Sequence, residues 1–272
     1  IILLIIGALG GAWMISGVVP TLIYYGLQIV HPSIFLFATC ILCAIVSLVI
    51  GSSWTTIATV GVALVGIGTA QGYEPGWIAG AIISGAYFGD KVSPLSDTTV
   101  LASSSSGTPL FTHIKYMMVT TVPSFVIAMV VFLIVSICHD APSAFQTQDF
   151  TADLTSTYNI SPWLLLVPVL TGVLIARKVP AILTLFVASL LAGIAAFFFQ
   201  PQIIGAVASG NAPDPSQQLT FLEGFKGIFI SYYGATSVDT GNVVLNELVA
   251  TRGMTGMMNT IFLIISAVTF GG

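Results

Sequence analysis

The sequence predicts an all-α membrane protein that crosses the bilayer several times. Hydrophobic residues make up 56% of the 272 residues and charged residues only 6%, against roughly 25% charged in an ordinary soluble domain. Mean hydropathy is +1.03. The apolar stretches suit spanning helices of ~20 residues better than the alternating ~10-residue strands of a membrane β-barrel. We therefore expect a multi-pass protein of the cell membrane that has the lipid bilayer as its first partner.

The first 30 residues carry no charge, but two features interrupt them. Gly10 and Gly11 are the first interruption, and the sequence SGVVP at 16–20 is the second. Because proline removes a helical hydrogen bond, we predict a broken or kinked span here. The chain begins with Ile1, without an initiator Met or a charged segment ahead of the apolar run, so it does not resemble a signal peptide. We expect residues 1–272 to be one incomplete transmembrane domain, cut at both ends.

Two apolar runs, residues 34–50 and 57–68, flank the polar sequence GSSWTT at 51–56. Arms of roughly 12 to 17 residues fall short of the ~20 that a crossing helix needs. We therefore predict a re-entrant hairpin over residues 34–70, which enters and leaves the membrane on one side.

A second irregular element follows the hairpin. Residues 76–88 are uncharged, and the sequence GDKVSPLSDTT at 89–99 then stops the apolar run. Pro94 in its centre favours local unwinding. We predict a discontinuous helix over residues 75–106.

The remaining apolar segments predict ordinary spans. The loops at 139–160 and 200–218 contain Asp but no Lys or Arg, whereas Lys115 and Arg177 lie at the opposite ends of their spans. The positive-inside rule then puts Lys115 and Arg177 in the cytoplasm and the two loops outside. The predicted spans are residues 117–138, 161–176 and 179–199, and an amphipathic surface arm is predicted over 219–252.

The segment 89–99 has the composition of an ion site. Residues 1–73 contain no Asp, Glu, Lys or Arg, and ionisable groups inside a bilayer are costly and usually functional. Na+ needs several hard oxygen ligands, and unwound backbone adds free carbonyls. The candidate Na+ ligands are the carboxylates of Asp97 and Asp90, the hydroxyls of Ser93, Ser96, Thr98 and Thr99 on the broken helix, and those of Ser52, Ser53, Thr55 and Thr56 on the hairpin tip.

Competition between two ions at one carboxylate would suffice for exchange. In a low dielectric the neutral, protonated carboxyl group is favoured, so Na+ and H+ become alternative occupants of the same oxygens. Asp97 is the first choice for this role and Asp90 the second, because Lys91 adjoins Asp90 and would serve as its structural charge partner. The alternative is an interfacial, salt-bridged cap on a helix end. We expect no cofactor, only the transported Na+ and H+.

The sequences GAIISGAYFGDKVSPLSDTT at 80–99 and GSSWTT at 51–56 resemble NhaC-type Na+/H+ antiporters of the ion transporter superfamily, as do LIYYG at 22–26 and FTHI at 111–114. The resemblance implies a secondary transporter that exchanges cytoplasmic Na+ for external H+. It also implies two inverted repeats, each with a re-entrant hairpin and a broken helix that meet at the ion site. This chain would carry the first part of that architecture.

The alternatives to antiport are an organic-acid exchanger, an intramembrane aspartyl protease and a channel. Some relatives of the family couple Na+ and H+ to malate and lactate exchange, and Lys91 is the candidate cation for such an organic acid. An intramembrane aspartyl protease would need its two Asp residues on two helices, whereas Asp90 and Asp97 lie on one broken segment. A channel is the remaining alternative. Enzyme motifs such as HExxH, a nucleophile elbow or a phosphate loop are missing, so we expect no enzyme. We expect no nucleic-acid partner because no basic arm is present, and a homodimer is compatible with the sequence.

Overall fold

The structure is a computed structural model that describes residues 2–94, 96–138, 144–177, 179–210, 220–238, 246 and 249–271. Within these residues the secondary structure is helical apart from one isolated β-bridge between Thr236 and Thr251. The helical stretches long and apolar enough to cross a membrane are Pro32–Val49, Ser53–Ala70, Leu110–Cys138 and Ile182–Phe199. The predicted all-α, polytopic membrane fold is confirmed.

The chain divides into two compact units. One, here called the terminal unit, consists of Ile1–Leu22, Gln148–Leu174 and Val179–Gly272. The other, the hairpin unit, consists of Ile23–Thr147 and Ile175–Lys178. All the candidate ion ligands belong to the hairpin unit.

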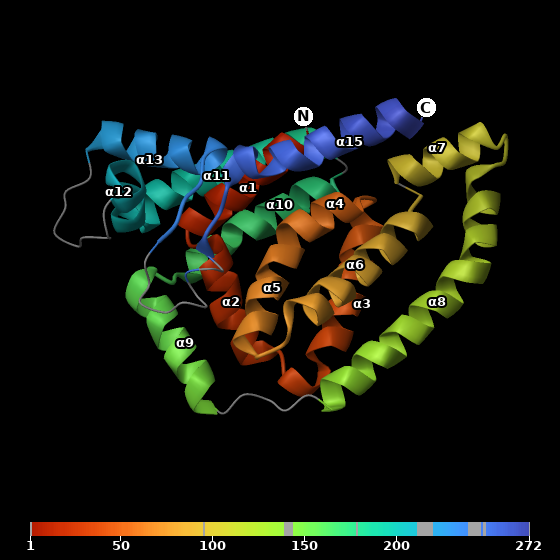
Figure 1. The fold of residues 1–272 in the computed structure, drawn as a ribbon, viewed down its shortest axis with the longest axis horizontal. Helices are drawn as coiled ribbons and strands as arrows, with labels where there is room; N and C mark the ends of the chain where they lie inside the picture. Colours follow the sequence, from red (N-terminus) through yellow and green to blue (C-terminus); the bar gives the residue numbers. More distant parts are fainter. Residues whose placement is uncertain are drawn as a thin grey trace. The chain divides into compact units, whose positions relative to one another are not determined.

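The hairpin unit is built on three neighbouring helical rods. The first is α3 (Phe35–Ile50) and the third is α6 (Pro75–Val92). The second, here called the second arm, consists of α4 (Ser53–Thr56), a π-helical turn (Ile57–Gly61) and α5 (Val62–Ala70). Figure 1 shows α3, α5 and α6 side by side. The broken helix continues as α7 (Asp97–Ser105), and α8 (Leu110–Cys138) packs on α3 and α6.

Small residues let α3 and α6 approach closely. A methyl group added to Gly85 would collide with the carbonyl oxygen of Cys40, and one added to Gly89 would collide with that of Ala44. Small residues four positions apart are a common means of close helix packing in membranes. The glycine pair therefore fixes the end of α6 against the end of α3, where the candidate ligands lie.

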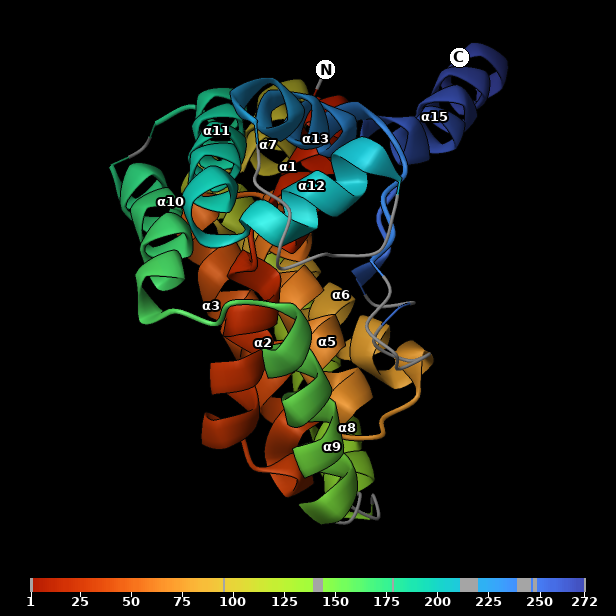
Figure 2. The same ribbon diagram turned by 90° about the vertical axis from the view of Figure 1, so that its left-hand side faces the viewer.

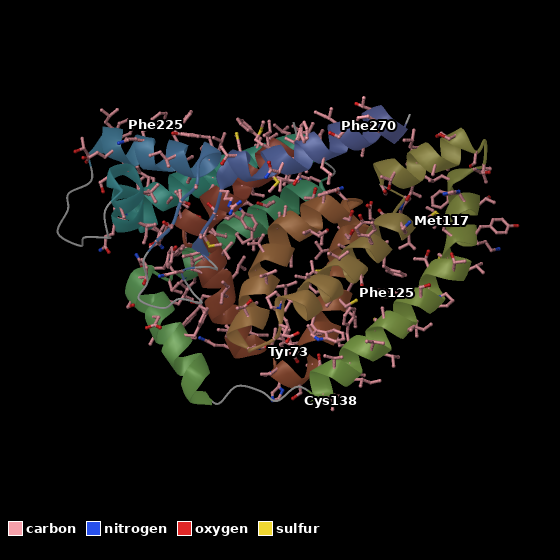
Figure 3. The ribbon with its side chains drawn as sticks, in the orientation of Figure 1. Tyr73, Met117, Phe125, Cys138, Phe225 and Phe270 are labelled. Carbon is pink, nitrogen blue, oxygen red and sulfur yellow. The ribbon has the colours of Figure 1, made fainter. Side chains whose placement is uncertain are left out.

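Hydrogen bonds fasten the opposite end of the hairpin unit. The turn after α5 donates to the segment before α3, from Gln71 Nε2 to the Val30 carbonyl at 2.8 Å and from the Tyr73 hydroxyl to the Pro32 carbonyl at 2.8 Å. Burial raises the pKa of Tyr73, and a hydrogen bond with Ser136 partly offsets that effect. Figure 3 marks Tyr73 at this end and Phe125 on the inner side of α8, where Phe125 stacks on Phe88 of α6 with ring centroids 3.9 Å apart.

The terminal unit gathers around α1 (Ile2–Ile15). This helix packs on α11 (Ala181–Phe199), α13 (Phe221–Tyr233) and a 3-10 turn (Gly253–Met257), as Figure 2 shows for α1, α11 and α13. Gly7 and Gly11 make the close contacts, against the carbonyls of Gly253 and Ser231. The other helices that contribute residues to this unit are α2 (Val18–Ile29), α9 (Ala144–Thr157), α10 (Leu166–Ala176), α12 (Pro201–Ser209) and α15 (Met258–Gly271), with a 3-10 turn at Pro162–Leu165.

The break in the first apolar run lies at Ser16 and Gly17, one of the two regions that the sequence indicated. Gly17 has φ of 77°, a conformation that favours glycine, and the helix axes on its two sides differ by 68°. Pro20 is the third residue of α2, where a helix needs no N–H hydrogen bond. Gly10 and Gly11 lie inside α1 and do not interrupt it.

The two arms of the hairpin are longer than the sequence suggested. Each helical stretch, Pro32–Val49 and Ser53–Ala70, has 18 residues and is apolar enough to cross a membrane. The polar residues Ser53–Thr56 form the first turn of the second arm instead of a separate loop. Re-entry of the hairpin over residues 34–70 therefore stays a prediction.

The later segments follow the predicted order with different boundaries. The helix expected at 117–138 begins at Leu110 and has 29 residues, and Ala181–Phe199 lies inside the expected span 179–199. The expected span 161–176 starts with a 3-10 turn before Leu166–Ala176. The segment 139–160, expected as a loop, contains the helix Ala144–Thr157. Of the expected arm 219–252, Phe221–Tyr233 is helical, and residues 239–245 lie outside the described part of the chain.

Candidate ion site

The tip of the hairpin is a tight turn between two helices. Gly51 follows α3 with φ of 72°, a left-handed helix cap that favours glycine, and its N–H donates to the Ser47 carbonyl at 2.7 Å. Ser52 then caps α4, because its Oγ accepts hydrogen bonds from the N–H and the hydroxyl of Thr55 at 3.3 and 3.1 Å. Two residues therefore end one helix and start the next, which concentrates hydroxyl groups at the tip.

Three buried threonines line the start of the second arm. The hydroxyl of Thr56 donates to the Ser52 carbonyl at 3.0 Å, and the hydroxyl of Thr59 donates to the Thr55 carbonyl at 2.7 Å. Thr55, Thr56 and Thr59 are 2%, 0% and 4% exposed. A π-helical turn, Ile57–Gly61, overlaps this region, and such turns are frequent at functional sites. The hydroxyl oxygens retain lone pairs that can coordinate a cation.

The carboxylate of Asp90 joins the end of α6 to the hairpin tip. Its Oδ2 accepts a hydrogen bond from the hydroxyl of Ser53 at 2.8 Å. Ser53 is 4% exposed and Asp90 is half-buried, whereas Lys91 is exposed. No contact joins the Lys91 and Asp90 side chains among the described residues, and the pairing of these two charges stays a prediction.

The break after α6 is anchored on both sides. The hydroxyl of Ser93, which is fully buried, donates to the Leu48 carbonyl in the last turn of α3 at 2.8 Å. From the other side of the break, the hydroxyl of Thr99 donates to the carbonyls of Lys91 and Asp90 at 3.2 and 3.4 Å. The Asp90 carbonyl also accepts a hydrogen bond from the Ser93 N–H at 3.3 Å. Hydrogen bonds from both sides therefore fix the break next to Asp90.

Ser96 caps the second half of the broken helix. Its Oγ accepts from the Thr99 N–H at 3.4 Å and shares a hydrogen bond with the exposed Thr98 hydroxyl at 2.9 Å. Asp97 is the first residue of α7, and its side chain lies outside what the structure describes.

The structure thus brings together part of the predicted set. Hydrogen bonds link Ser53 to the Asp90 carboxylate, and Thr99 to the backbone carbonyls of Asp90 and Lys91. The Ser93 hydroxyl donates a hydrogen bond to α3. Ser52, Thr55 and Thr56 cluster at the tip, while Ser96 and Thr98 form a local cap. Carboxylate, hydroxyl and carbonyl oxygens are the ligands that hard cations take. Among the described residues no group of three His, Cys, Asp or Glu side chains could hold a metal.

One residue of this cluster escaped the sequence prediction. The hydroxyl of Ser47, fully buried on α3, donates to the Ala86 carbonyl at 2.6 Å, one helical turn before Asp90. The sequence indicates this role of Ser47 only weakly. Ser47 is the only residue with a hydroxyl group between Cys40 and Ile50, and it lies one helical turn before Gly51.

The chain is similar to proteins named as antiporters. The profile of the Na+/H+ antiporter family matches residues 85–272. The whole chain is 42% identical to the Na(+)/H(+) antiporter NhaC of Alkalihalophilus pseudofirmus, covering 54% of that protein. It is 38% identical to the malate-2H(+)/Na(+)-lactate antiporter of Bacillus subtilis, covering 54%, and 35% identical to the Na(+)/H(+) antiporter NhaC of Bacillus subtilis, covering 56%.

The chain spans about half the length of these curated relatives. No solved structure shows a significant match to it. The family profile covers well over half of the chain and includes Asp90, Asp97 and the break between them. The chain therefore belongs to the Na+/H+ antiporter family.

Proposed function

We propose that the protein is a secondary active transporter that exchanges Na+ for H+ across the cell membrane, with the two ions competing for the carboxylates of Asp97 and Asp90. The observation that carries the proposal is the hydrogen bond between Ser53 and Asp90. It brings a carboxylate of a broken helix to a hairpin tip rich in buried hydroxyls, inside a chain with very few charges.

The chemistry of exchange follows from this arrangement. A Na+ ion takes Asp90, Asp97 and neighbouring hydroxyl and carbonyl oxygens as ligands, and protonation removes the negative charge that attracts it. The Ser53 hydroxyl donates a hydrogen bond to Asp90, and the Thr56 and Thr59 hydroxyls donate hydrogen bonds to backbone carbonyls. All three oxygens therefore remain acceptors for the ion. Occupation by Na+ and by H+ are then mutually exclusive, and exposure of the site to each side in turn produces antiport.

The test is exchange by the complete protein in proteoliposomes. A Na+ gradient should drive proton movement in the wild type, and Asp97→Asn should abolish it, with Asp90→Asn strongly reducing it. Glu74→Gln is the matched control, because Glu74 is exposed in the turn before α6 and its side chain makes no cap hydrogen bond. Full Na+-dependent proton movement in Asp97→Asn would contradict the role given to Asp97.

A second candidate function is Na+- and H+-coupled exchange of small organic acids. The 38% identical relative named as a malate and lactate antiporter favours it. Adding malate or lactate to the same vesicles separates the two candidates, since Na+/H+ exchange alone needs neither acid.

A further inference from the structure

The hydroxyl of Ser47 lies in the buried contact between α3 and α6. The Ser47 side chain is fully buried, and its hydroxyl donates to the Ala86 carbonyl of α6 at 2.6 Å. Serine hydroxyls inside a helix often bond a carbonyl three or four residues earlier in their own helix, as those of Ser104 and Ser124 do here. The Ser47 hydroxyl instead crosses to a neighbouring helix.

Close packing of the two helices does not require this hydroxyl. The two backbones approach through Gly85 and Gly89, and an alanine in place of Ser47 would keep the Cβ that packs there. The Ala86 carbonyl has a helical donor of its own, the N–H of Asp90 four residues later in α6. The Ser47 hydroxyl therefore satisfies no backbone group that the helix leaves unpaired, and its position calls for another reason.

The side chain of Ser47 restrains the turn of α6 that carries Asp90. Its hydroxyl is a second donor to the Ala86 carbonyl, which closes the same helical turn as the Asp90 N–H. A methyl group added to Gly89, the residue before Asp90, would lie 2.7 Å from the Ser47 Cβ. Ser47 thus contacts this turn both through its hydroxyl and through its Cβ.

The backbone of Ser47 holds the hairpin tip. Its carbonyl accepts the N–H of Gly51 at 2.7 Å, the hydrogen bond that ends α3. Ser53, which donates to the Asp90 carboxylate at 2.8 Å, follows two residues after that glycine. One residue therefore links both partners of the bond between Ser53 and Asp90, the tip through its carbonyl and the α6 turn through its hydroxyl.

We propose that Ser47 is a positioning residue for Na+ binding, whose hydroxyl keeps the turn of Asp90 in register with the hairpin tip so that the Ser53 hydroxyl meets the carboxylate. Ser47 acts through Ser53 and Asp90 and is not itself an ion ligand. The inference rests on the proposed exchange function and adds a residue that sets the Na+ affinity of the same site. An effect that passes through the bond between Ser53 and Asp90 must disappear when that bond is absent.

The experiment is a double-mutant cycle on the complete protein in proteoliposomes. The Na+ dependence of proton flux is measured for the wild type, Ser47→Ala, Ser53→Ala and the double variant. Ser47→Ala should raise the Na+ concentration for half-maximal exchange about fivefold, the factor that corresponds to one neutral hydrogen bond, with the maximal rate unchanged. In the Ser53→Ala background the same substitution should change that concentration by less than about twofold.

Ser136→Ala is the matched control. Ser136 is also fully buried, and its Oγ accepts the Leu36 N–H at 3.1 Å at the opposite end of α3. Its loss removes a buried hydrogen bond between helices away from Asp90, so it should lower the thermal stability in detergent and leave the Na+ dependence unchanged. Ser47→Cys, whose thiol is a weak donor, should give a Na+ dependence between those of the wild type and Ser47→Ala.

Two outcomes would overturn the inference and leave the proposed exchange standing. One is an unchanged Na+ dependence in Ser47→Ala, and the other is an equal increase in the wild-type and Ser53→Ala backgrounds, which would show a merely structural role. If thermal unfolding shows that Ser47→Ala fails to fold, Ser47→Cys is compared in the two backgrounds by the same criterion. Wild-type vesicles without Na+-driven proton movement would instead contradict the proposed function, and this inference with it.

Discussion

At the scale of single residues, the pair Ser53 and Asp90 is the centre of the candidate site. The hydroxyl that reaches Asp90 comes from the hairpin tip, 37 positions earlier in the chain. The neutral Ser53 hydroxyl holds the Asp90 carboxylate in place and leaves its negative charge uncompensated. A lysine at the same place would neutralise that charge. The carboxylate therefore remains available to a cation.

We predict that Ser53→Ala raises the Na+ concentration needed for half-maximal exchange by about tenfold, because Asp90 loses a hydrogen bond to a charged group. The measurement is the Na+ dependence of proton flux in proteoliposomes. Ser124→Ala is the control, since among the described residues the exposed Ser124 hydroxyl donates to the Thr120 carbonyl of its own helix, α8. An unchanged Na+ dependence in Ser53→Ala would exclude Ser53 from the site.

The sequence indicates which polar segments lie close together better than it indicates individual contacts. The density of hydroxyls at 51–56 and 89–99 indicated two facing elements, and the bond from Ser53 to Asp90 supports their proximity. The expected pairing of Lys91 with Asp90 rested on adjacency alone, and adjacent residues on a helix point to different sides. Ser47 was missed because its partner, the Ala86 carbonyl, is a backbone group of another helix, which composition does not reveal.

At the scale of elements, the packing of α3 on α6 determines where Asp90 lies. Gly85 and Gly89 bring the two backbones together, and Ser47 and Ser93 add hydrogen bonds between the helix ends. The hairpin and the broken helix should therefore behave as one stable unit.

We predict that Gly89→Ala destabilises the protein by about 1 to 3 kcal/mol, the usual effect of overpacking, because the added methyl collides with the Ala44 carbonyl. Thermal unfolding in detergent measures the loss. Gly76→Ala in the same helix is the control, since nothing lies within 4 Å of its added methyl and alanine favours a helix by ~1 kcal/mol over glycine. Equal stability of the two variants would contradict the close packing of α3 on α6.

The order of the elements could be predicted from the sequence, but their exact ends could not. Proline, glycine and charge marked the breaks near residues 16–20, 51–56 and 89–99, and the structure has helix ends in all three regions. The sequence did not indicate that Pro20 lies in the first turn of α2 or that Ser53–Thr56 form the first turn of the second arm. Both differences arise because the first turn of a helix tolerates proline and is capped by serine, so residues that suggest a loop can also begin a helix.

At the scale of the whole molecule, the direction of ion exchange depends on the orientation of the spans in the membrane. The helix Leu110–Cys138 is 29 residues long, enough to carry Lys115 and Cys138 to opposite sides of a bilayer of ~30 Å. The positive-inside rule assigns Lys115 to the cytoplasm. Cys138 should then face outward.

We predict that an impermeant maleimide labels Cys138 in intact cells, because this cysteine is exposed while Cys40 and Cys43 are buried. Cys138→Ser should remove the label. A cysteine introduced by Lys115→Cys in that background should react only after permeabilisation. Labelling of Cys138 only in permeabilised cells would reverse the orientation.

Competition between Na+ and H+ can be measured as proton release when Na+ binds to the purified complete protein. Na+ and H+ that compete for the carboxylates of Asp90 and Asp97 must exchange on binding, so Na+ titration of weakly buffered wild type should acidify the solution. Asp97→Asn should remove most of the released protons, while Glu74→Gln should release as many as the wild type. Na+ binding that releases no protons and has the same affinity at every pH would contradict the competition between the two ions.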